Sequence, residues 1–152
     1  MTVRNYTPND AAALLAIFRK NIPDAFGEHE IDDYAGFLPK NQDPYFVAEH
    51  DGRVTGACGY YLIREGSVAR ICWILADPDL RGLGSGSTLL RHVLDQIRTH
   101  PQVTIIECET SQVAYVFFEK FGFQLHYTRP NHWAPGLDLY FMSRTPTGPS
   151  QK

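Results

Sequence analysis

Arg81-Gly82-Leu83-Gly84-Ser85-Gly86-Ser87 stands between an apolar run that ends at Ala76 and a segment with helical periodicity. Glycines at alternate positions let the backbone approach a ligand closely and adopt left-handed conformations. The helix that follows offers N–H groups without intrahelical acceptors, together with the positive end of its dipole. This order of strand, glycine-rich turn and helix N-terminus predicts a site for a phosphate or pyrophosphate.

The composition is that of one globular domain. The chain has 152 residues, of which 43% are hydrophobic, which is enough for a substantial core. A formal net charge of -3 and dispersed lysines and arginines argue against a nucleic-acid surface. The N-terminal residues lack a basic and apolar secretion signal, and no apolar run approaches the ~20 residues that span a bilayer. We therefore expect no nucleic-acid or membrane partner.

The cysteines indicate the compartment. Cys58, Cys72 and Cys108 are odd in number, widely spaced and embedded in apolar segments. This pattern is typical of reduced, buried thiols and of neither a disulfide framework nor a metal site. We expect a cytoplasmic protein without bound metal.

Periodicity and turn residues predict how strands and helices alternate around the glycine turn. Apolar or alternating runs predict strands over residues 3–6, 45–49, 54–63, 68–76, 103–108, 123–127 and 137–143. Helical spacing predicts a helix that begins at Pro8, a less regular helical segment over 24–38, a helix between the turn and Pro101, and another over 112–121. Turns at 51–52 and 64–66 make the strands before the glycine turn an antiparallel meander. Residues 130–136 are expected to form a loop.

The turn matches neither of two common nucleotide-binding motifs. A P-loop requires a Lys-Ser/Thr pair after its last glycine, and that pair is missing here. The dinucleotide fingerprint requires G-x-G-x-x-G spacing after a parallel strand, whereas these glycines alternate and follow a meander. A phosphate ligand held without lysine or metal suggests a diphosphate that is not itself transferred, such as that of coenzyme A.

At this point the chain resembles the GNAT acetyltransferase superfamily. Residues 81–86 are similar to its pyrophosphate motif, Gln/Arg-x-x-Gly-x-Gly/Ala, and residues 114–123 (AYVFFEKFGF) to its second signature, A-x-x-F-Y-E-K-x-G-F. The resemblance implies an α+β fold with about four helices and a mostly antiparallel sheet splayed between strands 4 and 5. The resemblance covers nearly the whole chain, from Val3 to about Arg144. We expect a single domain over residues 1–144 and a disordered tail over residues 145–152.

The resemblance also implies where acetyl-CoA, the expected co-substrate, is bound. The backbone at the end of the fourth strand would hold the pantetheine arm, and the glycine turn would hold the pyrophosphate, while two further residues follow the fifth strand. These coenzyme-binding residues are Ile74, Leu75, Ala76, Arg81, Gly82, Leu83, Gly84, Ser85, Gly86, Ser87, Ser111 and Phe118. Ser111 stands where the family often has asparagine, and it either contacts the coenzyme or caps the next helix.

The catalytic residues are less clear because the chain departs from the family pattern. Many members use the tyrosine of F-Y-E-K to protonate the leaving thiolate, but the matching residue here is Phe118. Tyr115, one turn earlier, is either its substitute or a packing residue. Glu107 and Glu109 end the fifth strand on the same side, and they are either general bases or solvated charges. Catalysis is predicted to involve Tyr115, Glu107 and Glu109.

The acceptor is expected to be a primary amine of a small molecule or peptide, opposite the coenzyme. Glu30 provides an acidic group for it, and Tyr34, Tyr60 and Trp133 can form the walls of its site. Alternatively, the acidic residues of this segment form a solvated helix face and bind no acceptor. Because of Phe118, a second possible function is that of a catalytically degenerate acyl-CoA-binding module. A dinucleotide-dependent oxidoreductase is the third. The chain is expected to be a monomer or homodimer.

Overall fold

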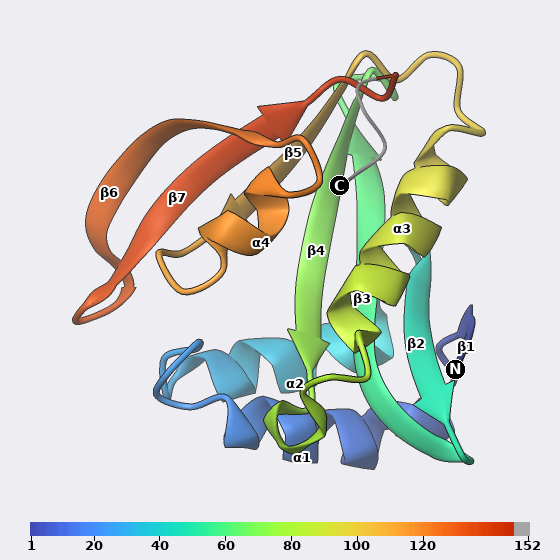
Figure 1. Ribbon diagram of the computed structural model, residues 1–152, viewed down its shortest axis with the longest axis vertical. Helices are drawn as coiled ribbons and strands as arrows, with labels where there is room; N and C mark the ends of the chain where they lie inside the picture. Colours follow the sequence, from blue (N-terminus) through green and yellow to red (C-terminus); the bar gives the residue numbers. More distant parts are fainter. Residues whose placement is uncertain (148–152) are drawn as a thin grey trace.

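The computed structural model describes residues 1–147 and places a mixed sheet between two pairs of helices (Figure 1). In chain order the elements are β1 (Thr2–Asn5), α1 (Ala11–Lys20), α2 (Glu30–Lys40), β2 (Tyr45–His50), β3 (Arg53–Ile63), β4 (Val68–Ala76), α3 (Ser85–Ile97), β5 (Ile105–Thr110), α4 (Tyr115–Glu119), β6 (Gln124–Ala134) and β7 (Leu137–Arg144). Single 3-10 turns precede α1 (Pro8–Asp10) and follow β4 (Pro78–Leu80). Within this described part, no helix is long and apolar enough to cross a membrane.

The strands follow the order β1-β2-β3-β4-β5-β7-β6. Every neighbouring pair is antiparallel except β4 and β5, which are parallel and pair only over Val68–Arg70 and Ile105–Glu107. Beyond Arg70 the two strands diverge, and β5, β7 and β6 curve away from the rest of the sheet (Figure 1). The predicted α+β fold with a sheet splayed between strands 4 and 5 is confirmed.

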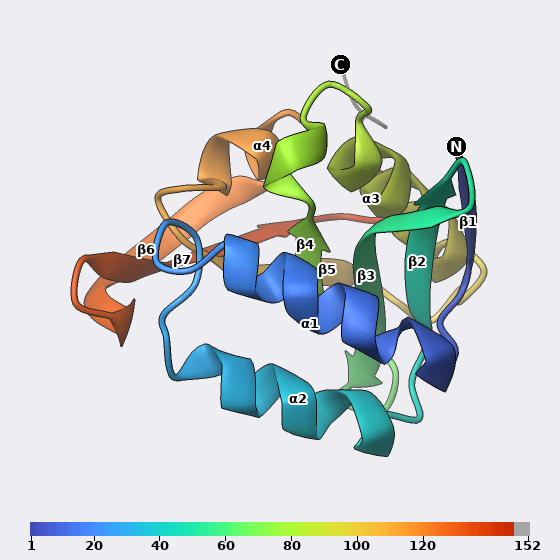
Figure 2. The same ribbon diagram turned by 90° about the horizontal axis from the view of Figure 1, so that it is seen from below.

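The helices cover opposite faces of this sheet. Figure 2 shows α1 and α2 on one face and α3 and α4 on the other. Alternation along the strands supplies a separate core to each layer. Leu14 and Phe18 of α1 pack in the core beneath α1 and α2, whereas Leu90 and Val93 of α3 pack in the core on the other face.

A bulge in β4 changes which side chains face α1 and α2. Trp73 has φ +38°, a value unusual for a residue with a Cβ, and the register between β3 and β4 shifts between Ala57 and Gly59. As a result, the neighbouring residues Cys72 and Trp73 both pack against the core of α1 and α2. The bulge therefore turns an additional aromatic side chain toward the gap between β4 and β5.

Several expected boundaries differ from the structure. Residues 130–134 continue β6 rather than forming a loop, and Pro130 is tolerated because β6 is an edge strand, where a missing N–H disrupts no inner ladder. Regular helix starts at Glu30 instead of residue 24, and α4 covers only Tyr115–Glu119 of the expected 112–121. Most of the expected tail, residues 148–152, lies outside the described residues.

Candidate functional site

The space between the diverging strands is a cleft of about 530 Å³. Its walls come from both layers of helices: α4 and the start of α3 on one side, and the loop after α1 with α2 on the other. A smaller recess of about 300 Å³ lies at the glycine turn and shares Asn21, Ala76, Gly86 and Phe117 with the cleft. The two cavities therefore form one continuous site that runs from the turn into the fork of the sheet.

The glycine turn has the backbone conformation that its sequence predicts. Gly82 has φ +99° and Gly84, which caps the N-terminus of α3, has φ +74°. A Cβ placed on either glycine would meet nothing within 4 Å, so the backbone here is open to a ligand. The first N–H groups of α3 border this space without intrahelical acceptors. This arrangement fits a pyrophosphate.

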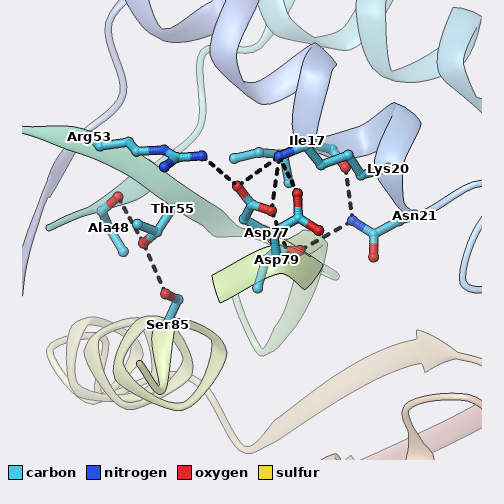
Figure 3. Close-up of polar contacts among 10 residues, drawn as sticks. Ile17, Lys20, Asn21, Ala48, Arg53, Thr55, Asp77, Asp79 and Ser85 are labelled. Atoms are coloured by element: carbon cyan, nitrogen blue, oxygen red, sulfur yellow. Dashed lines mark hydrogen bonds and ion pairs between the residues drawn. The ribbon is translucent and has the colours of Figure 1, made fainter. Parts of the chain in front are cut away.

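The neighbouring serine side chains have different surroundings. The hydroxyl of Ser85 is buried and donates to Oγ1 of Thr55 at 2.9 Å, so that this side chain faces the sheet (Figure 3). Ser87 lines the recess, as do Arg81 and Gly86. Leu83 is among the exposed hydrophobic residues and lines neither cavity. At Ser85, only the backbone can serve a ligand at the turn.

Charged side chains hold the end of β4 in place (Figure 3). The carboxylate of Asp77, whose side chain is 2% exposed, accepts from the backbone N–H of Asp79 at 3.0 Å. It also forms ion pairs with Lys20 of α1 at 3.2 Å and Arg53 of β3 at 3.5 Å. These contacts fix the strand end from which the glycine turn departs.

The part of β4 before this anchor is available to an extended ligand. Ile74, Leu75 and Ala76 all line the cleft. After Arg70, β4 has no strand partner on its β5 side within residues 1–147. An unpaired strand edge binds extended chains through backbone hydrogen bonds. The predicted pantetheine residues therefore lie on a free strand edge that leads to the turn.

The two carboxylates predicted as bases share a face of β5 but have different partners. Glu107 is buried and forms ion pairs with Arg70 at 2.7 Å and Arg64 at 3.8 Å. It does not line the cleft. Glu109 lines the cleft, and no cationic side chain of residues 1–147 lies within ion-pair distance of it. Only Glu109 is thus positioned to meet a bound molecule.

Helix α4 presents phenylalanines to the cleft. Phe117 and Phe118 both line it, and Phe118 is 1% exposed. Tyr115 does not line it, and its ring packs against Tyr140 of β7 with 4.9 Å between ring centroids. Ser111 lines the cleft and its buried hydroxyl accepts from the N–H of Val113 at 3.2 Å, which is a capping interaction at the approach to α4.

The four predicted acceptor residues divide into two groups. Glu30 and Trp133 line the cleft, and the indole of Trp133 donates to the carbonyl of Thr110 at 3.0 Å. Tyr34 and Tyr60 are buried in the two cores and do not line it. The hydroxyl of Tyr34 pairs with the Tyr45 hydroxyl at 2.8 Å, and that of Tyr60 with Nε2 of His100 at 2.9 Å.

Glu30 sits at a close contact between two distant segments. Its carboxylate is buried and accepts from the N–H of Gly27 at 2.8 Å. Burial raises the pKa of Glu30 above its ordinary value, although the Gly27 hydrogen bond acts in the opposite direction. A Cβ on Gly27 would lie 2.9 Å from Cβ of Ala134, so the loop after α1 touches the end of β6. This contact brings together the two segments that carry Glu30 and Trp133, which both line the cleft.

Sequence reasoning missed several residues that line the cleft. They are Asn21, Phe26, Phe37, Tyr61, Arg70 and Trp73. The position of Trp73 depends on the β4 bulge, and that of Arg70 on the parallel pairing with β5, so neither can be recognised from local sequence. For Tyr61 a signal did exist, because strand alternation places it opposite Tyr60.

A forked sheet with a glycine turn at the end of one arm defines a class of proteins, the acyltransferases that use an acyl-coenzyme A. A sequence model of the Acetyltransferase (GNAT) family matches residues 11–123 of this chain. The chain therefore belongs to the GNAT acetyltransferase family and is an acyltransferase. No protein with curated information matches it significantly in sequence.

Solved structures share the fold over nearly the whole chain. The ribosomal-protein-alanine N-acetyltransferase from Brucella melitensis is 22% identical, with a TM-score of 0.76 and coverage of 95% of this chain and 99% of the other. An aminoglycoside 6'-N-acetyltransferase complexed with coenzyme A is 13% identical, with a TM-score of 0.78 and coverage of 98% and 99%. The yncA protein of Salmonella typhimurium, solved with its cofactor acetyl-CoA, is 20% identical, with a TM-score of 0.76 and coverage of 100% and 97%.

Proposed function

We propose that the protein transfers the acetyl group of acetyl-CoA to a primary amine by direct attack within a ternary complex. The observation that carries the proposal is a cleft bordered by both helix layers, with an open glycine turn at one end and, on the side of α1 and α2, the carboxylates of Glu30 and Glu109, which form no ion pair within residues 1–147. Two substrates can thus reach the fork of the sheet from different sides. Holding both reactants in one site lowers the entropic part of the barrier.

On the coenzyme side, the chain supplies mainly backbone groups. The turn from Arg81 to Ser87, with the first N–H groups of α3, would bind the pyrophosphate. Residues 74–76 would bind the pantetheine arm along their free edge. Phe118 and Ser111 would border the arm from α4 and the end of β5. Because backbone N–H groups can hold a pyrophosphate that is not itself transferred, the proposal needs no lysine at the turn.

The transfer requires a balance of protons as well as of bonds. One bond forms between the amine nitrogen and the acetyl carbon, and the bond between that carbon and sulfur breaks. A protonated amine gives up two protons, one to a base before attack and one after it, while the leaving sulfur gains one. An unperturbed amine with a pKa near ~10 is almost fully protonated at neutral pH, so a base is needed.

Glu109 is the base that the geometry favours. It lines the cleft and has no cationic partner among residues 1–147, whereas the Glu107 carboxylate is engaged by two arginines. A carboxylate at the mouth of the fork can take the proton directly or through water. In this arrangement Glu107 would position Arg70.

The leaving sulfur also needs a proton donor. The sequence predicts Tyr115 for this role because Phe118 replaces the usual tyrosine. The Tyr115 ring packs on Tyr140, and the cleft wall of α4 is formed by Phe117 and Phe118. The leaving sulfur can instead take its proton from solvent or from the acceptor itself, which requires no rearrangement of α4.

Coenzyme A release from acetyl-CoA across a panel of amines tests the proposal. The panel contains polyamines, aminoglycosides, amino acids and peptides, and thermal shift with acetyl-CoA and with NAD is measured in parallel. We expect stabilisation by acetyl-CoA alone and turnover of one acceptor class. Binding of acetyl-CoA without turnover of any amine would instead support a catalytically degenerate acyl-CoA-binding module.

A further inference from the structure

The acceptor half of the cleft carries charges of both signs on one face of the sheet. Ala69 and Ile71 pack in the core of α3 and α4, so Arg70 between them points toward the face of α1 and α2. Glu109 follows Cys108, which packs in that same α3 and α4 core, and therefore points the same way. Arg70 and Glu109 both line the cleft.

The positive charge comes from Arg70. Its side chain is 24% exposed, and it donates from Nε at 3.2 Å and from Nη2 at 2.7 Å to a single oxygen of Glu107. Arg64 approaches the second oxygen of Glu107 at 3.8 Å. Two guanidinium groups thus share one carboxylate, which leaves the group with one positive charge. Among residues 1–147, Arg70 is the one lysine, arginine or histidine that lines the cleft.

The negative charges and the apolar walls complete the pattern. Glu30 and Glu109 line the cleft, and neither forms an ion pair with a cation of the described chain. The cleft is also lined by aromatic side chains from four different segments: Phe26, Phe37, Trp73 and Trp133. A molecule that satisfies all these groups has a cation, an anion and an apolar body.

We infer that the acetyl acceptor is a free α-amino acid with an apolar side chain, bound by its carboxylate to Arg70 with its amine toward Glu109. The inference rests on the proposed acetyl transfer and names its substrate class; the product is the N-acetyl amino acid. Guanidinium groups favour carboxylates because they can donate two parallel hydrogen bonds. A polyamine or aminoglycoside would instead place a second positive charge near Arg70, and a peptide N-terminus has no carboxylate beside its amine.

The wild-type enzyme provides the first test. The kcat/KM for acetylation is measured for leucine, methionine and phenylalanine, and for their carboxamides, which keep the amine and the side chain but lose the anion. We expect the acids to exceed the amides by tenfold or more, since a charge-assisted contact is lost. Equal or better acetylation of the amides would overturn the inference.

A pair of arginine variants assigns the preference to one residue. Arg70→Gln should reduce kcat/KM for the acids but not for the amides, so that their ratio falls to about one. Arg64→Gln is the matched control, because Arg64 contacts the same glutamate without lining the cleft, and it should retain the wild-type ratio. A retained ratio in Arg70→Gln contradicts the assignment. If that variant fails to fold, the wild-type comparison of acids and amides still tests whether the acceptor is a free amino acid.

The outcomes also separate this inference from the proposed function. Turnover confined to polyamines, aminoglycosides or peptides would refute the amino-acid acceptor while leaving acetyl transfer intact. Binding of acetyl-CoA with no turnover of any amine would refute both.

Discussion

The side-chain amide of Asn21 donates to the carbonyl oxygen of Ala76 at 3.2 Å, and thereby ties the end of α1 to the end of β4. The same amide donates to the carbonyl of Ile17 at 2.9 Å. Asn21 lines both the cleft and the recess at the glycine turn. One side chain therefore couples the helix layer on the acceptor side to the strand end on the coenzyme side.

Replacing Asn21 by alanine should weaken both the fold and the coenzyme site. Loss of two hydrogen bonds, at about 1 kcal/mol each, should lower the free energy of unfolding by about 1–2 kcal/mol. The strand end then loses one restraint, and KM for acetyl-CoA should rise severalfold. Asn41→Ala is the control, because the Asn41 amide donates to the exposed carbonyl of Asp43 at the end of α2. Equal effects of the two variants on KM would argue against the coupling.

The glycine turn can be tested with a pair of glycines that have the same backbone conformation. Gly84→Asp places a charge and a side chain where the pyrophosphate is proposed to bind, and should abolish acetyl-CoA binding in calorimetry. Gly84 has φ +74° and Gly52, in the hairpin between β2 and β3, has φ +75°, both with open space around a Cβ. Gly52→Asp should thus carry a similar strain of about 1–2 kcal/mol but retain affinity. Normal affinity of Gly84→Asp would refute the placement.

The sequence predicted the parts of the site that depend on local spacing. The glycines at 82 and 84 have the positive φ that the turn requires. The fork between the fourth and fifth strands is also present, and it was implied by the family resemblance of residues 81–86 and 114–123. The residues that line the acceptor side of the cleft depend instead on which face of its strand each residue occupies and on how the strands are aligned. Tyr60 and Tyr61 are neighbours on opposite faces of β3, and only Tyr61 lines the cleft. The segment 24–38 has no clean helical period, so the buried position of Tyr34 within it could not be recognised.

The buried Glu30 predicts how stability depends on pH. Burial raises the pKa of Glu30 above its ordinary value of 4.5, so between the two values the folded state binds more protons than the unfolded state. The contribution of this group to stability is therefore present at low pH and is lost as the pH rises from 4.5 through the raised pKa. In Glu30→Gln, chemical denaturation across this window should show a smaller loss with rising pH than the wild type. An unchanged slope would contradict the raised pKa.

Removal of the Tyr115 hydroxyl separates catalysis from packing. In Tyr115→Phe the ring contact with Tyr140 is retained, and the cleft wall formed by Phe117 and Phe118 is untouched. We expect kcat to change by less than about twofold, since loss of a general acid typically costs about a hundredfold or more. A fall of that size, at unchanged stability, would assign the proton donor to Tyr115 as the sequence predicts.

Amide substitution of the two carboxylates of β5 should affect different properties: turnover at Glu109 and stability at Glu107. Glu109→Gln keeps the shape of the side chain but cannot accept a proton, so kcat should fall by about a hundredfold or more while the thermal transition stays near its wild-type value. Glu107→Gln removes the partner of Arg70 and Arg64, which should cost about 1–3 kcal/mol of stability. Its kcat, measured below the transition, should fall by much less. If Glu107→Gln instead abolished turnover in a folded protein, Glu107 would be the base.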